Sequence, residues 1–146
     1  MRIAELNEQV SRRWLNQSSP GKIPATDENL QKAKDFILEK WRERAAERGN
    51  QMPSDLSYSC KFTTLFVKMV FGGSIKGNFD HQFNFIDGRI VDLNHDAADV
   101  VSLDDPHRHD ELFFGNRDHI GSMKSCLPRV EQWVEEFIKV VDHENT

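Results

Sequence analysis

The chain has 146 residues, the usual size of one domain, and 38% of them are hydrophobic, which is enough for one core. Its formal net charge of −5 argues against a general nucleic-acid-binding surface, because phosphate contacts need clustered Lys and Arg residues. Two cysteines make no disulfide framework, and no run approaches the ~18 apolar residues of a membrane helix. The amphipathic first segment is not a secretory signal. We expect a single-domain cytoplasmic protein without membrane or nucleic-acid partners.

The first 71 residues predict helices. Residues 1–50 hold two amphipathic patterns, of which the second begins after Thr26 or Asp27 and ends at Gly49. A third pattern, "CKFTTLFVKMVFGG", is apolar at positions i, i+3, i+4, i+7 and i+8 and predicts a buried helix that stops at Gly72. Cys60 stands in the first turn of that helix.

The segment "DHQFNFIDGRIVDLN", residues 80–94, alternates as a β-hairpin does. Asp87 and Gly88 are a strong signal for a two-residue turn. In that register alternate positions share a face, so His81 lies on the face of the apolar side chains of its strand, Phe83 and Phe85. We expect this face to join the apolar stripe of the helix that begins at Cys60, in a cluster that includes Phe62, Leu65, Phe66 and Met69.

The last third of the chain is predicted to be a polar loop followed by a helix. Residues 95–126 are irregular and rich in Asp and His, and residues 127–142 carry a helical apolar stripe with Pro128 in the first turn. Residues 58–94 then form the centre of one domain spanning residues 1–146. The expected fold class is α+β, with helices packed on a small antiparallel sheet.

Cys60 is a candidate nucleophile because of its position. A helix N-terminus presents unpaired N–H groups and a partial positive charge, both of which favour a thiolate and can stabilise an oxyanion. The alternative is a small buried residue at a helix start, a common place for free cysteine. The second cysteine, Cys126, has no histidine at a suggestive spacing and is interpreted as structural.

The hairpin supplies a base and an orienting group. Opposed side chains in such a hairpin lie ~5 Å apart at Cβ and diagonal ones ~7 Å apart. His81 therefore has Asn94 directly opposite and Asp92 diagonal to it, and either one is able to hold the imidazole. Cys60, His81 and Asp92 would act as nucleophile, base and orienting group, with Asn94 as the alternative third member. The competing interpretation is a core histidine bonded to Asp92, with Cys60 unrelated.

The order of cysteine on a helix start, histidine on one strand and aspartate on the next resembles the papain and transglutaminase-like cysteine hydrolases. Residues 58–94, from "YSCKFTTLFVKMVFGGSI" through "HQFNFIDGRIVDLN", look most like the small bacterial YunG-like family. The resemblance implies Cys60 as nucleophile, His81 as base and Asp92 as orienting residue. It carries no particular substrate. We expect a cysteine hydrolase or acyltransferase that acts on a peptide or amide-containing substrate, which the sequence does not identify, and that needs no cofactor. The glutamine that papain-like enzymes place before their cysteine has only a weak counterpart here, Gln51.

Two alternatives come from other functional classes. One is a binding or interaction module that keeps the fold without turnover. The other is a metal-binding protein that uses His107, His109 and His119 in the polar loop, although their spacing matches no recognised zinc motif. We expect no metal site and interpret this segment as a solvated loop or as a cover for the active-site cleft.

Overall fold

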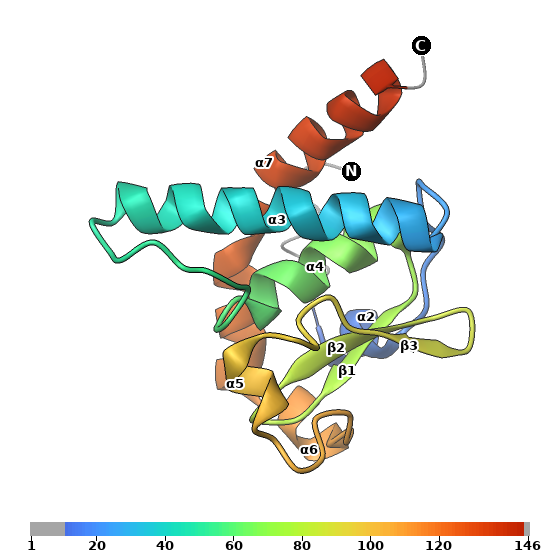
Figure 1. Cartoon of the computed structure of the whole chain (residues 1–146). Coiled ribbons are helices and arrows are strands. Elements are labelled where there is room, and N and C mark those ends of the chain that lie inside the picture. The colour runs from blue at the N-terminus through green and yellow to red at the C-terminus, as the bar shows by residue number, and fades with distance from the viewer. Residues whose placement is uncertain (1–10, 145–146) are drawn as a thin grey trace.

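A computed structural model of the chain describes residues 11–144. Helices and strands follow in the order α2 (Arg12–Asn16), α3 (Asp27–Glu47), α4 (Cys60–Phe71), β1 (Ser74–Gly77), β2 (Gln82–Ile86), β3 (Arg89–Val91), α5 (Ala98–Val101), α6 (Glu111–Phe114) and α7 (Arg117–Glu144) (Figure 1). The strands form one antiparallel sheet in the order β1-β2-β3. The predicted α+β class with a small antiparallel sheet is confirmed. None of the helices in these residues is long and apolar enough to cross a membrane.

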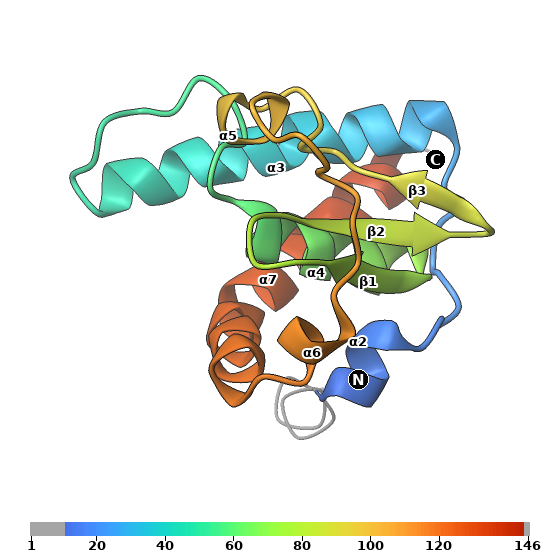
Figure 2. The same cartoon turned by 90° about the horizontal axis from the view of Figure 1, so that it is seen from below.

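Helix α4 occupies the centre of the fold, between the sheet and the long helix α7 (Figure 2). Most of its residues are buried, as its dense apolar pattern predicts. Helix α3 crosses both α4 and α7, since the Phe36 ring lies 6.0 Å from that of Phe66 and 5.3 Å from that of Phe137. The sheet and these three helices therefore enclose one core, and the N-terminus of α4 lies at its edge.

One charged residue lies inside this core. Lys68 is 2% exposed, and its ammonium donates hydrogen bonds to the carbonyl oxygens of Gln17 and Gly73, both at 2.8 Å, and to Ser19 Oγ at 3.0 Å. Burial lowers the pKa of Lys68 to about 8. The three acceptors hold residues 17–19 against the end of α4.

Helix α4 stops at Gly72, as predicted, because the chain must turn where it meets residues 17–21. Gly72 has a φ of 84°, and a Cβ there would lie 2.4 Å from the carbonyl oxygen of Ser19. Gly73 also has a positive φ and forms an antiparallel bridge with Ser19. Only glycine combines this backbone conformation with so close an approach.

The hairpin turn is the one the sequence predicts. Asp87 and Gly88 have φ angles of 51° and 79°, the left-handed values of a two-residue turn that matches strand twist. Ile86 pairs with Arg89 and Phe85 with Ile90, so the predicted register is confirmed. Strand β1 adds an edge by pairing with β2, with Ile75 opposite Asn84.

The predicted core face of the hairpin is wrong. Ile86 joins the core shared with α4, and Asn84 donates a hydrogen bond to the Thr64 carbonyl of α4 at 3.0 Å. Phe83 is buried on the opposite face, and Phe85 is only half-buried. That opposite face is covered by the segment between α5 and α6, which Figure 2 shows crossing the sheet. Because both faces are covered, alternation alone does not reveal which one meets α4.

The polar loop is shorter than predicted. Helix α7 begins at Arg117, well before residue 127, so that Pro128 lies inside it. Asn116 Oδ1 caps this start by accepting hydrogen bonds from the backbone N–H groups of Asp118 at 2.8 Å and His119 at 3.3 Å. Residues 95–126 also contain the short helices α5 and α6. Most of the first predicted helix lies outside the described residues, although α2 falls at its end.

The end of α4 gives a first stability test. Gly72→Ala should lower the free energy of unfolding by more than ~1 kcal/mol, because it combines a left-handed φ with a backbone clash. Gly121→Ala is the matched control, since this glycine lies inside α7, where an added Cβ would meet open space, and it should stabilise by roughly 0.5–1 kcal/mol. Urea unfolding at pH 7 measures both. Equal effects of the two substitutions would contradict the close contact at Gly72.

Candidate active site

Cys60 is the first residue of α4, and the loop before it is tightly held. Ser59 takes the N-cap position, but its side chain does not cap the helix. Its hydroxyl donates to the Leu56 carbonyl at 2.7 Å and contacts the Thr63 hydroxyl at 3.0 Å instead. The first N–H groups of α4 therefore remain without a side-chain cap from Ser59, which is what an oxyanion site at Cys60 requires.

Tyr58 adds local strain beside the cysteine. Its φ of 68° lies in the left-handed region, which a non-glycine aromatic residue rarely adopts. The conformation is fixed by a hydrogen bond from the Tyr58 N–H to Asp99 Oδ2 at 2.9 Å. As a result the Tyr58 ring is 82% exposed, next to Cys60. Strained backbone of this kind is concentrated at functional sites.

His81 stands at the end of a turn that Asn78 organises. Asn78 Oδ1 accepts hydrogen bonds from the N–H groups of Asp80 at 2.8 Å and His81 at 3.2 Å. The Asn78 amide also donates to the Arg108 carbonyl at 2.7 Å, which ties the turn to the segment covering the sheet. The imidazole is thereby fixed immediately before β2 and is only 2% exposed.

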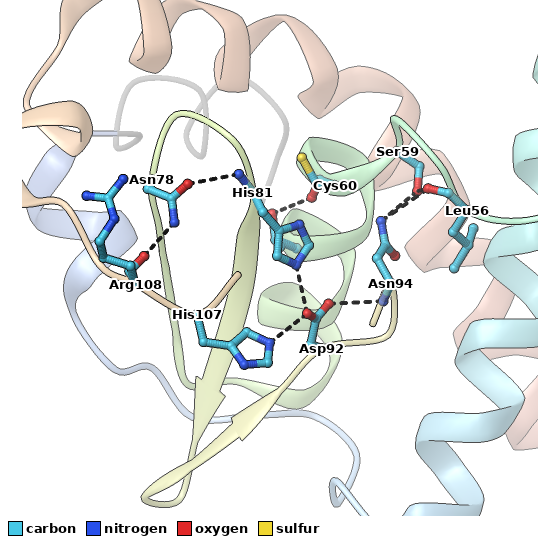
Figure 3. Close-up of polar contacts among 10 residues, drawn as sticks. Leu56, Ser59, Cys60, Asn78, His81, Asp92, Asn94, His107 and Arg108 are labelled. Atoms are coloured by element: carbon cyan, nitrogen blue, oxygen red, sulfur yellow. Dashed lines mark hydrogen bonds and ion pairs between the residues drawn. The ribbon is translucent and has the colours of Figure 1, made fainter. Parts of the chain in front are cut away.

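The structure confirms the predicted contact between His81 and Asp92. His81 Nε2 lies 2.7 Å from Asp92 Oδ2, and both side chains are buried (Figure 3). An ionised carboxylate only accepts hydrogen bonds, so the proton sits on Nε2 of the ring. Figure 3 shows Cys60 on the other side of the ring from Asp92. The carboxylate therefore fixes the orientation of the ring and leaves its second nitrogen for a partner other than Asp92.

Asn94, the alternative third member, has a different partner. Its side-chain nitrogen donates to Ser59 Oγ at 3.1 Å and to the Leu56 carbonyl at 3.2 Å. Its backbone N–H donates to Asp92 Oδ1 at 3.1 Å. Asn94 thus joins the strand end that carries Asp92 to the loop that carries Cys60, and it does not bond His81.

The Asp92 carboxylate also accepts from a second histidine, which sequence reasoning did not connect with it. His107 Nε2 lies 2.9 Å from the same Oδ2 atom, and its ring packs edge-on against Phe83 with centroids 4.9 Å apart. His107 reaches Asp92 because residues 103–110 cross the sheet. A contact between a loop and a strand end so far apart in the chain has no local sequence signal.

His81 and Asp92 each stabilise the charged form of the other. Burial alone lowers the pKa of His81, but the hydrogen bonds and charges of Asp92 and Cys60 outweigh it and raise the pKa to about 9. Burial alone raises the pKa of Asp92, but the hydrogen bond and charge of His81, followed by the hydrogen bond of His107, hold it below its ordinary value. At neutral pH the pair is an imidazolium and a carboxylate.

The three histidines proposed as metal ligands do not converge. His107 bonds Asp92, whereas His109 Nδ1 accepts from the Gly77 N–H at 3.1 Å and His119 packs on Phe113. Among residues 11–144 the ligand atoms of a different set, His81, Asp92 and His107, lie within 4.8 Å of one another. Their nitrogen–oxygen separations of 2.7 and 2.9 Å fit hydrogen bonds. Tetrahedral zinc ligands lie roughly 3.4 Å apart, so a metal ion would have to break both bonds.

Cys60 and His81 line a cleft of about 480 Å³. Two further buried side chains line it, Gln82 and His119. Gln82 is the first residue of β2, and its side chain points away from the face that carries Phe83. His81 precedes the strand and lies in a turn, so its side chain does not follow the alternation of the strand. Both side chains therefore line the cleft. Gln51 is exposed and lines a separate depression near Trp41.

Cys126 differs from Cys60 in its position and burial. It lies inside α7, is 7% exposed, and directs its thiol to the Ser122 carbonyl at 3.4 Å. Burial raises the pKa of the Cys126 thiol. These features fit the structural role expected of it, and they make Cys126 an internal reference for measurements on Cys60.

Comparison with protein-family models, with curated proteins and with solved structures found no match for this chain.

The raised pKa of His81 gives a pH-dependent stability. Stability that comes from a raised pKa is fully present below the unfolded-state value of 6.5 and is lost as pH rises through about 9. We expect the unfolding free energy of the unsubstituted protein, relative to His81→Gln, to fall by roughly 2–4 kcal/mol between these pH values. The difference between the proteins isolates His81, because Lys68 titrates in both. Parallel pH profiles from urea unfolding would contradict the buried ion pair.

Proposed function

We propose that this protein is a cysteine hydrolase or acyltransferase on a papain or transglutaminase-like core, as the resemblance to the YunG-like family suggests. The observation that carries the proposal is the buried 2.7 Å hydrogen bond between His81 and Asp92, with the Cys60 side chain on the other side of the ring. A buried imidazolium beside the sulfur favours the thiolate, which is the nucleophilic form of cysteine.

In the proposed reaction the Cys60 sulfur attacks the carbonyl carbon of an amide or thioester. The carbonyl oxygen becomes an oxyanion, which the N–H groups of the first turn of α4 are placed to stabilise. His81 gives its proton to the leaving nitrogen or sulfur as the carbon–leaving-group bond breaks, and an acyl-thioester remains on Cys60. His81 then takes a proton from water or from an acceptor amine, whose attack on the acyl-thioester releases the acyl group and restores the Cys60 thiolate beside the protonated His81. Asp92 holds the ring and stabilises its charged form throughout.

The His81–Asp92 pair should control the reactivity of Cys60. At pH 7, His81→Ala and Asp92→Ala should each slow alkylation of Cys60 by iodoacetamide at least about tenfold, because both remove the charge pair that favours the thiolate. Asn94→Ala should lower the unfolding free energy but slow alkylation much less, because Asn94 bonds the loop at Leu56 and Ser59. Peptide mass spectrometry measures the rates at Cys60 and, as a reference, at Cys126.

Two outcomes would change the assignment, provided that circular dichroism shows the variants folded. If Asn94→Ala reproduces the His81→Ala loss while Asp92→Ala leaves the rate unchanged, Asn94 is the orienting residue. If none of the three substitutions slows the reaction, His81 and Asp92 form a polar patch and the hydrolase proposal fails. A binding module without turnover would keep the reactive Cys60 but form no acyl-enzyme with any of a panel of aminoacyl thioesters and anilides.

A further inference from the structure

The cleft at Cys60 contains buried polar atoms that no other described residue satisfies. Gln82 Oε1 and both ring nitrogens of His119 have no hydrogen-bond partner in residues 11–144, and these side chains are only 3% and 4% exposed. Asp99 Oδ1 is also a buried atom without a partner in these residues, although Asp99 as a whole is half-buried. All three residues line the cleft. Because buried polar groups are almost always paired, such a concentration indicates a site that a ligand completes.

Three of these four orphaned atoms are suited to accept hydrogen bonds. A carboxylate oxygen accepts only, and an amide oxygen likewise. Burial, and then the charge of Lys61, lowers the pKa of His119 to about 4, so its ring is neutral, with one nitrogen that accepts a hydrogen bond and one N–H that donates. The group that satisfies Asp99, Gln82 and His119 together is therefore one rich in N–H donors.

Aromatic rings form the rim of the same cleft. Phe79 is 83% exposed, and its ring meets the edge of Phe113 with centroids 5.9 Å apart. Phe113 in turn lies 4.3 Å from the His119 ring. The exposed Tyr58 ring also lines the cleft. Aromatic faces attract organic cations, and they also bind the apolar part of a ligand.

The side chains that line the cleft carry more negative than positive charge, which suits a cationic ligand. Asp80, Asp99 and Asp118 line it, against one cationic side chain, Lys61. The imidazolium of His81 is already paired with the Asp92 carboxylate, so it adds no net charge to the cleft. A ligand entering the cleft thus meets an excess of negative charge, which attracts cations and slows the approach of anions.

We propose that the cleft binds a primary ammonium group attached to an apolar or aromatic body, and that the carbonyl attacked by Cys60 belongs to a substrate of this class. Asp99 and the neutral His119 accept hydrogen bonds from the ammonium group, and Phe79 and Phe113 pack on the apolar body. The identification of this ligand as a substrate rests on the proposed function, whereas the binding site itself does not.

Phenethylammonium is a suitable probe, with phenylethanol and phenylacetate as neutral and anionic analogues of the same shape. Phenethylammonium should protect Cys60 from methyl methanethiosulfonate in a saturable manner, at a concentration at least about fivefold lower than either analogue requires. Asp99→Asn, which keeps an acceptor for the Tyr58 N–H, should abolish this difference, and Phe79→Ala should weaken protection by all three. Asp142→Asn, at an exposed position near the end of α7, is the control and should change nothing.

Charged thiol reagents test the same site without a competing ligand. The rate of each reagent with Cys60 is divided by its rate with free mercaptoethanol. On this scale aminoethyl methanethiosulfonate should modify Cys60 faster than its sulfonatoethyl analogue. Asp99→Asn should reduce the ratio of the two normalised rates more than Asp142→Asn does. Equal protection by the three probes, or a ratio that Asp99→Asn and Asp142→Asn change alike, would overturn the ammonium site.

The outcome is distinguishable from failure of the proposed function. If the cleft prefers the ammonium probe but His81→Ala and Asp92→Ala leave the alkylation rate of Cys60 unchanged, the binding site is supported and the hydrolase is rejected. If these substitutions slow the alkylation of Cys60 but the cleft shows no ammonium preference, the hydrolase proposal is retained and this substrate class is rejected.

Discussion

The buried hydrogen bond between His81 and Asp92 lies where three parts of the chain meet: the hairpin, the loop before α4 and the segment that crosses the sheet. Asp92 ends the hairpin, His81 precedes it, and Asn94 extends the same strand end to the loop that begins α4. The carboxylate also anchors His107 of the segment that crosses the sheet. Removing one partner of such a pair leaves an uncompensated buried charge, so the arrangement is held to one geometry.

Under the proposed function, that constraint contributes to the chemistry at Cys60 more than to stability. Removing a buried charge pair from water costs several kcal/mol per ion, and the attraction between the charges often only offsets this cost. The pair fixes the orientation and charge of the ring before any ligand arrives, which is the preorganisation that the proposed acyl transfer would need.

The sequence predicts much of this arrangement because its signals are local. Asp87 and Gly88 specify the turn, the turn specifies the register, and the register brings Asp92 within reach of His81. The core face of β2 was predicted wrongly, because a segment distant in sequence covers the other face and makes both faces partly apolar. For the same reason His107 was not connected with Asp92. The convergence of Gln82 and His119 depends on where α7 begins, and the cap at Asn116 was not recognised.

The coupling between Cys60 and His81 is tested most directly by the titration of His81 itself. The imidazole signals of His81 can be followed by NMR against pH in the unsubstituted protein and in Cys60→Ala, with His107→Gln used to assign the neighbouring ring. We expect a pKa of about 9 in the unsubstituted protein. In Cys60→Ala we expect a lower value that still exceeds 6.5, because Asp92 keeps its hydrogen bond. An identical titration in both proteins would show that the thiol and the imidazole do not interact, and Cys60 would then have no base.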